Sequence, residues 1–300
     1  MLRIPLSVRL RAAALAAALA ACAGVPAATA ASAPERIVAA GGVVTEILYA
    51  LGVEDRIVGV DTTSLHPPQA LEDHPDIGYV RALSAEGVLS LEPDRVIATD
   101  AAGPPDALAL IREAGVPVEM VGEDATEAGV LARIRTIGAL VGAEARAEAL
   151  AEGVEAGFAD LAAARAAIDR PVRVLFVLSL QNGRAMVGGT GTSADAIIRL
   201  AGGVNAAAAI EGYKPVTDEA IIAAAPDVVL SISRGDHALS ADDVFSIPAF
   251  ALTPAADARR LVSMDGLALL GFGPRTPQAA RELMRALYPQ AGEIRAEAAR

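Results

Sequence analysis

Short runs of apolar, mainly β-branched residues alternate along the chain with longer segments whose apolar residues recur every three or four positions. The short runs are typical of buried strands, and the longer segments are typical of amphipathic helices. In the first half the predicted strands are 37–40, 57–60, 95–99 and 116–121, and the predicted helices are 44–51, 105–114 and 126–141. Strands that alternate with helices in this way indicate an α/β fold with parallel sheets.

A second series of the same kind begins at Pro171, with predicted strands at 172–179, 228–231 and 260–264. Between the two series, residues 143–168 contain no proline and consist mainly of strong helix formers. We expect one continuous helix there. It is either a crossover on the surface of one domain or a strut that joins two lobes.

An internal repeat favours the strut. Ser/Thr, Glu, Pro and Asp recur at one offset of 133 residues, as Ser84, Glu86, Pro93 and Asp94 and then as Thr217, Glu219, Pro226 and Asp227. Each copy predicts a short helix that a hydroxyl residue caps and a proline ends, followed by a strand. A weaker repeat at an offset of 150 residues relates Ile47, Leu48 and Gly52 to Ile197, Ile198 and Gly202.

We therefore predict two similar α/β lobes, 35–141 and 171–289, each with a parallel central sheet. A long helix within 142–170 joins them. Two such lobes suit a ligand held in the cleft between them, at the carboxyl ends of the strands.

The first 33 residues predict a signal peptide. Arginines precede an apolar run at 12–21 that is too short to span a membrane, and small residues follow it. Ala28-Thr29-Ala30 fits cleavage near residue 30, whereas Leu19-Ala20-Ala21-Cys22 resembles a lipobox in which Cys22, the only cysteine, would carry a lipid. Both alternatives remain open, and both predict export to the periplasm.

Net charge and motifs narrow the function. The formal net charge of −12 argues against nucleic acid, which requires a basic face. The glycine-rich run 188–192 has neither the lysine of a phosphate-binding loop nor the spacing of a dinucleotide fingerprint, and a Gly-x-Ser-x-Gly motif is absent from the sequence. His66 and His74 leave open a metal site in an exported metal-dependent enzyme, or they are ordinary loop histidines. We predict a binding protein and not an enzyme.

Tyr79 is the best candidate for ligand chemistry. It follows Gly78 in a loop between the predicted second strand and the Glu86 helix, at the predicted cleft. A phenolate oxygen suits ferric iron, and tyrosine is an axial haem ligand in other proteins. The alternative is a tyrosine that covers the core and leaves its hydroxyl in water.

The second lobe offers Tyr213 and Lys214 at nearly the same spacing before its own glutamate, Glu219. Two facing loops, each with a tyrosine and a cation, suit a flat apolar ligand with anionic edges. His237 follows a predicted strand, and it is either a ligand residue or a plain loop histidine.

Four segments carry a resemblance to a known family: residues 78–91, 193–198, 212–215 and 269–277. From Ile37 to Tyr288 the chain resembles the haem-binding branch of the periplasmic binding proteins that dock on cobalamin-type importers. The resemblance implies capture of ferric haem in the periplasm, for iron acquisition, and its delivery to an ABC permease with its ATPase subunits. An outer-membrane haem receptor system would act upstream. A ferric siderophore or cobalamin carrier of the same class is the alternative.

The resemblance also implies roles for single residues. Tyr79 binds the haem iron, Arg81 meets a propionate or the phenolate, and Arg234 lies over the iron-bound tyrosine. Glu86 and Glu219 bind arginines of the two permease subunits, one from each lobe.

The number of haems follows from a departure from the family pattern. Some relatives add a histidine in the second lobe and hold two haems, whereas residues 189–192 here contain none. We therefore expect one haem. His237 is an addition within the Arg234 loop and a candidate distal donor.

Overall fold

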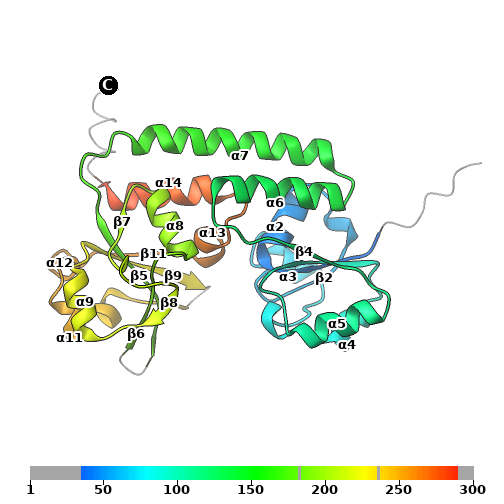
Figure 1. The fold of residues 1–300 in the computed structure, drawn as a ribbon, viewed down its shortest axis with the longest axis horizontal. Coiled ribbons are helices and arrows are strands. Elements are labelled where there is room, and N and C mark those ends of the chain that lie inside the picture. The colour runs from blue at the N-terminus through cyan, green and yellow to red at the C-terminus, as the bar shows by residue number, and fades with distance from the viewer. Residues whose placement is uncertain (1–34, 182–183, 235–236, 290–300) are drawn as a thin grey trace, which may run out of the picture. The chain divides into compact units, whose positions relative to one another are not determined.

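The fold was determined as a computed structural model that describes residues 35–181, 184–234 and 237–289 (Figure 1). All of them belong to one structural unit, which begins at Glu35. The predicted signal peptide and Cys22 lie outside the described residues, so the two processing routes stay predictions. Among the described residues, none of the helices combines the length and the apolar composition that crossing a membrane requires.

The first lobe has a four-stranded sheet. Its strands are β1 (Ile37–Ala40), β2 (Ile57–Val60), β3 (Arg95–Thr99) and β4 (Val118–Val121). Its helices are α2 (Gly42–Ala50), α3 (Gln69–Asp73), α4 (Ala85–Leu89), α5 (Pro105–Glu113) and α6 (Glu127–Leu140), with 3-10 turns η1 (Glu54–Arg56) and η2 (Val80–Ala82). The strand order is β2-β1-β3-β4, and all the pairs are parallel, as predicted.

Three of these strands have their predicted bounds, and the fourth begins two residues later than predicted. Pro117 lies just before β4, and proline has no N–H to donate to a ladder. Both faces of the sheet are covered. Alternate residues of β1 point to opposite faces: Ile37 and Ala39 pack in the cluster of α2 and α6, and Val38 and Ala40 pack in the cluster of α4 and α5.

The second lobe has a larger sheet of seven strands. They are β5 (Arg173–Gln181), β6 (Arg184–Gly188), β7 (Val204–Asn205), β8 (Tyr213–Pro215), β9 (Val228–Arg234), β10 (His237–Ala238) and β11 (Leu261–Asp265). The helices of this lobe are α8 (Ser193–Leu200), α9 (Asp218–Ala224), α10 (Ala241–Phe245), α11 (Pro248–Ala251), α12 (Pro254–Asp257), α13 (Gly266–Leu270) and α14 (Thr276–Leu287).

This second sheet is not wholly parallel, which corrects the prediction for it. The predicted strands β5, β9 and β11 are parallel, and so is the short β7. Of the four strands that the sequence pattern did not predict, β7 is parallel, whereas β6, β8 and β10 pair antiparallel. Only two residues separate β5 from β6, and a connection of that length allows an antiparallel hairpin but no parallel crossover.

The internal repeat corresponds to matching structure in the two lobes. The Ser84 hydroxyl accepts a hydrogen bond from the Gly87 amide at 3.2 Å, and the Thr217 hydroxyl accepts one from the Ala220 amide at 3.4 Å. These bonds cap α4 and α9 as predicted. The weaker repeat also has a counterpart, because Gly52 and Gly202 end α2 and α8 with positive φ angles of 62° and 80°.

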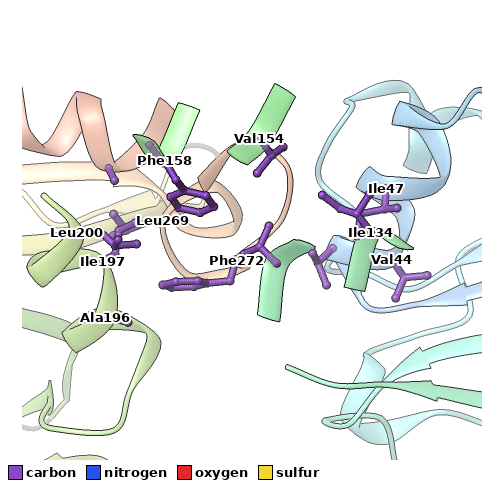
Figure 2. Close-up of a cluster of buried hydrophobic side chains, with 14 of the residues drawn as sticks. Val44, Ile47, Ile134, Val154, Phe158, Ala196, Ile197, Leu200, Leu269 and Phe272 are labelled. Carbon is purple, nitrogen blue, oxygen red and sulfur yellow. The ribbon is translucent and has the colours of Figure 1, made fainter. Parts of the chain in front are cut away.

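The connecting helix is α7 (Glu144–Arg165), whose 22 residues give a length of about 33 Å. It does not stand alone, because it packs along α6 and α14 (Figure 1). One hydrophobic cluster continues from the first lobe through these helices into the second (Figure 2), and it includes Ile47, Ile134, Phe158, Ile197 and Phe272. The two lobes therefore share a core.

Candidate functional site

A cavity of about 370 Å³ has residues of both lobes in its wall. The first lobe contributes Thr62, Thr63, Leu65 and Tyr79, and the second contributes Ile232, Gly266, Leu267, Leu270 and Gly271. Its volume is within the range of small-molecule sites, about 300–1,000 Å³. The lining is mainly apolar, with hydroxyl groups on the side of the first lobe.

The cavity lies where strands of both sheets end. Thr62 and Thr63 follow the carboxyl end of β2, Ile232 lies near the carboxyl end of β9, and Gly266 follows β11 directly. Ligands of α/β proteins bind outside the carboxyl ends of the parallel strands. The position agrees with the predicted cleft.

Hydrogen bonds hold the Tyr79 loop on both sides. The Gly78 carbonyl accepts from the Thr62 amide at 3.0 Å, and the Val80 carbonyl accepts from the Gly103 amide at 2.9 Å. Gly78 has a φ of 89°, a conformation that glycine adopts without steric cost. The loop therefore presents Tyr79 in a defined place, and the side chain is 47% exposed. Its hydroxyl makes no hydrogen bond to any residue that the structure describes.

A buried carboxylate, Asp61, organises the neighbouring loop. It is inaccessible to solvent, and it accepts hydrogen bonds from the amides of Gly41 (2.8 Å) and Thr63 (3.0 Å) and from the hydroxyls of Thr63 (2.8 Å) and Ser64 (3.2 Å). Buried charge is tolerated when it is bonded in this way. Asp61 was not among the predicted site residues, although Asp-Thr-Thr-Ser directly after a strand is a turn signal.

Helix α13 forms the opposite wall. The Asp265 carboxylate caps it by accepting from the Ala268 amide at 2.8 Å, and Leu267 and Leu270 lie one turn apart on the cavity side. These leucines were not among the predicted site residues either. Nothing local in the sequence distinguishes them from core residues, because their role depends on how the lobes meet.

A family model for periplasmic binding proteins matches residues 37–267, which include every residue that lines the cavity except Leu270 and Gly271. This chain is a periplasmic binding protein.

Solved structures of other members are similar over nearly the whole described chain. Apo RhuT, a periplasmic haem-binding protein of Roseiflexus sp. RS-1, is 42% identical with a TM-score of 0.81, over 85% of this chain and 98% of that one. The haem-binding protein BhuT, in complex with two haems, is 42% identical with a TM-score of 0.80, over 84% and 97%. The haem-binding protein HutB of Vibrio cholerae is 39% identical with a TM-score of 0.77, over 85% and 99%.

Tyr213 and Lys214 of this binding protein differ from their predicted setting. They lie in strand β8 and not in a loop, and the residues that line the cavity do not include them. The Tyr213 hydroxyl is 3.1 Å from the Ser193 hydroxyl, and its ring meets Phe176 edge-on with the ring centres 6.3 Å apart. Tyr213 and Tyr79 therefore have different environments, although each precedes a repeated glutamate by a similar distance.

The other predicted ligand residues are placed in part. Arg81 is exposed in η2, two residues after Tyr79. Arg234 ends β9 and His237 begins β10, and the two residues are partners in the antiparallel pairing of these strands. The side chains of Arg234 and His237 are not among those that the structure describes, so their predicted roles stay predictions.

His66 and His74 are the two histidines that the enzyme alternative would use as metal ligands. His74 Nε2 is 3.0 Å from the Tyr49 hydroxyl. Burial lowers the pKa of both histidines; Arg275 lowers that of His66 further, while Asp73 opposes the effect at His74. No group of three or more His, Cys, Asp and Glu side chains that could hold a metal ion occurs within 35–181, 184–234 and 237–289.

A larger cavity of about 480 Å³ belongs to the second lobe alone, with Leu175, Ala206 and Ile221 among its lining. It has neither a tyrosine nor a histidine in its wall. The smaller cavity is the better candidate for the binding site, because it joins both lobes at their strand ends and contains Tyr79.

Glu86 and Glu219 lie in the exposed first turns of α4 and α9, as the repeat predicts. The pKa of Glu219 lies below its usual range, because its carboxylate accepts a hydrogen bond from its own backbone amide and another from the Thr217 hydroxyl. Both side chains are available to a partner on the surface of this binding protein.

Proposed function

We propose that this periplasmic binding protein captures ferric haem and delivers it to an ABC permease of the inner membrane. The support comes from its likeness to RhuT, BhuT and HutB, each a haem-binding protein, at 39–42% identity over at least 84% of this chain. A mainly apolar cavity suits the flat face of a porphyrin. Haem is the transported ligand and takes no part in a reaction.

The observation that carries the proposal is the exposed Tyr79 on a loop that backbone hydrogen bonds hold at the cavity. A phenolate is a hard oxygen donor that matches ferric iron. Cobalamin and ferric siderophores bring their own iron or cobalt ligands, and they do not require a tyrosine there. Tyr79 is therefore proposed as the iron ligand.

Cations near Tyr79 complete the proposed site. Arg81, exposed two residues further on, is placed to bind a propionate or to favour the phenolate through its charge. Arg234 and His237 are proposed as the second lobe's contribution. Tyr213 and Lys214 do not line the cavity, and their contact with haem remains a prediction. The expected stoichiometry is one haem per protein.

Delivery is proposed to use Glu86 and Glu219, each binding an arginine of one permease subunit. Two equivalent carboxylates on two similar lobes match a permease with two-fold symmetry. Replacing both glutamates by alanine should abolish stimulation of the transporter's ATPase by the haem-loaded protein, with hemin affinity unchanged. Glu282→Ala, an exposed carboxylate on α14, is the matched control.

Membership of the periplasmic binding protein family supports export, and the way in which the signal peptide is processed is part of the proposal. We infer cleavage near residue 30 or, alternatively, lipid attachment at Cys22. Mass spectrometry of the mature protein from its native envelope distinguishes the two, because a diacylglyceryl group adds a defined mass to Cys22.

The ligand is tested by titrating the purified protein with hemin, iron-free protoporphyrin IX, cyanocobalamin and a ferric siderophore. Hemin should bind at one equivalent with a shifted visible band, and protoporphyrin IX should bind more weakly because it has no iron for Tyr79. Preference for cyanocobalamin or the siderophore would replace haem in the proposal. Two equivalents of hemin would overturn the expected stoichiometry.

A further inference from the structure

The segment between α13 and α14, two helices of the second lobe, lies against the first lobe. It has the sequence Gly-Phe-Gly-Pro-Arg at 271–275, and it directly continues the helix that forms the cavity wall opposite Tyr79. A contact that holds this segment against the first lobe therefore also holds the end of α13 in position. Two arginines do so, one from each lobe.

Arg133 of α6 is the first. It is only 3% exposed, and its guanidinium donates to the Phe272 carbonyl at 2.6 Å and the Gly271 carbonyl at 3.3 Å. It also donates to the Gly122 carbonyl of its own lobe at 2.6 Å. A planar guanidinium can serve several carbonyls at once, which a lysine ammonium on a flexible stem does less well. Arg133 thus holds the two carbonyls that directly follow α13 against the first lobe.

Arg275 is the second. Its Nη2 donates to Glu46 Oε2 at 2.9 Å, and its backbone amide donates to Glu46 Oε1 at 3.2 Å. Glu46 belongs to α2 of the first lobe and is 5% exposed. Arg275 Nη1 also lies 3.7 Å from Asp265, the residue that caps α13. This arginine therefore connects the first lobe to the segment after α13 and, through Asp265, to the start of α13.

Close packing leaves the segment little room between these anchors. Phe272 is buried with a φ of 50°, in the left-handed region, and it lies among side chains of both lobes (Figure 2). A Cβ atom at Gly273 would lie 3.0 Å from Val43 Cγ2 and 3.2 Å from Glu46 Oε1. The segment is seated in the first lobe and is not a loose linker.

We propose that Arg133 and Arg275 are positioning residues for the binding site: they set the separation between α13 and Tyr79 that the ligand must fill. The proposal rests on the haem-binding function proposed above. Neither arginine lines the cavity, so both act through the place of Leu267, Leu270 and Gly271. The sequence motif at 269–277 thereby has a role in geometry and not in direct ligand contact.

The test measures the rate at which hemin transfers from the holoprotein to apomyoglobin, well below each variant's unfolding transition. Arg133→Lys keeps the positive charge but removes the planar guanidinium that binds several carbonyls at once. Hemin should therefore leave about tenfold faster. The visible band should not change, because Tyr79 still binds the iron. Arg135→Lys is the control, because Arg135 lies on the same helix but is exposed and pairs with Glu148.

A wild-type transfer rate for Arg133→Lys, a changed visible band, or an equal acceleration in Arg135→Lys would overturn the proposal. Glu46→Gln tests the second anchor and decides the matter if Arg133→Lys does not fold; it should accelerate transfer in the same direction. If the wild-type protein binds no hemin at all, the proposed function fails. If the wild type binds hemin and both anchor variants release it at the wild-type rate, only this inference fails.

Discussion

The first lobe lines the cavity with four loop residues, three of which carry hydroxyl groups, whereas the second lobe lines it only with leucines, glycines and one isoleucine. Both walls lie at the carboxyl ends of parallel strands, so the same architecture presents a polar wall in one lobe and an apolar wall in the other. The difference lies in the segment that comes after each strand. After β2 the chain makes polar turns around Asp61, and after β11 it enters an apolar helix directly.

The two tyrosines extend this comparison. Tyr79 and Tyr213 come after glycines with φ angles of 89° and 73°, and they precede Glu86 and Glu219 by seven and six residues. Nevertheless, Tyr79 lies at the cavity, and Tyr213 lies in a strand with its hydroxyl close to Ser193. Similar spacing in a repeat therefore does not guarantee an equivalent role, because Tyr213 is part of a strand whereas Tyr79 lies in a loop at the cavity.

The largest effect is expected where the two lobes share their core. Phe272→Ala should lower the free energy of unfolding by about 3–5 kcal/mol, because it leaves a cavity among side chains of both lobes. Denaturant unfolding measures it, and one cooperative transition is expected for the wild type. Leu252→Ala, at a residue 70% exposed, should stay within about 0.5 kcal/mol. Separate transitions for the lobes would contradict a shared core.

A smaller loss of stability is expected from a change in the polar loop of the first lobe that follows β2. Asp61→Ala leaves two amides, of which that of Gly41 is buried, and two hydroxyls without their acceptor, and it should cost about 2–3 kcal/mol of unfolding free energy. Hemin affinity should fall with it, because Thr62 and Thr63 line the cavity. Asp160→Ala, exposed on α7, is the control. Unchanged stability in Asp61→Ala would show that the network does not hold the loop.

The two glycines give the sharpest test of the two tyrosine segments. Gly78→Ala and Gly212→Ala each force a side chain into a positive φ, at a cost of about 1–2 kcal/mol. Both positions have open space for a Cβ, so the costs should be similar. Only Gly78→Ala should weaken hemin binding in a titration. Equal loss of hemin affinity in both variants would assign the two tyrosine segments equal importance.

The smallest effect is a pH dependence that belongs to the first lobe. The pKa values of His66 and His74 are lowered in the folded protein, chiefly by burial, while the unfolded chain binds protons at the ordinary value of about 6.5. The stability that depends on the two rings being neutral is therefore fully present above about pH 6.5, and the free energy of unfolding decreases as the pH falls below that value. Thermal unfolding between about pH 7.5 and 5 should show this slope. The double variant His66→Gln, His74→Gln should flatten it, and an unaltered slope would contradict the assignment.

The strands of the first lobe could be predicted from the sequence to within two residues, although helix α3 was not predicted. Strands such as 37–40 and 95–99 are buried apolar runs, and Gly41 and Asp94 mark their ends. Local patterns are sufficient there because every strand is central or followed by a helix. The repeat likewise located both capped helices and both glutamates.

The second lobe was predicted less completely because its added strands are short, at two to five residues each. Strand β8 has three exposed residues, one of them proline, so neither apolar alternation nor β propensity identifies it. Strand β6 did have a local signal, since Asn182-Gly183 is a typical hairpin pair. The apolar wall formed by Leu267 and Leu270 had none, because it exists only once the two lobes are joined.

The central claim, that Tyr79 binds the haem iron, is tested most directly by hemin titration of Tyr79→Phe beside Tyr213→Phe. Both changes remove one hydroxyl from a tyrosine that is at least a third exposed. We expect Tyr213→Phe to keep the wild-type visible band and affinity. Tyr79→Phe should lose the band and bind hemin about 100-fold more weakly, which corresponds to roughly 2.7 kcal/mol. Titration of Tyr79→Phe with the wild-type band and affinity would contradict the claim.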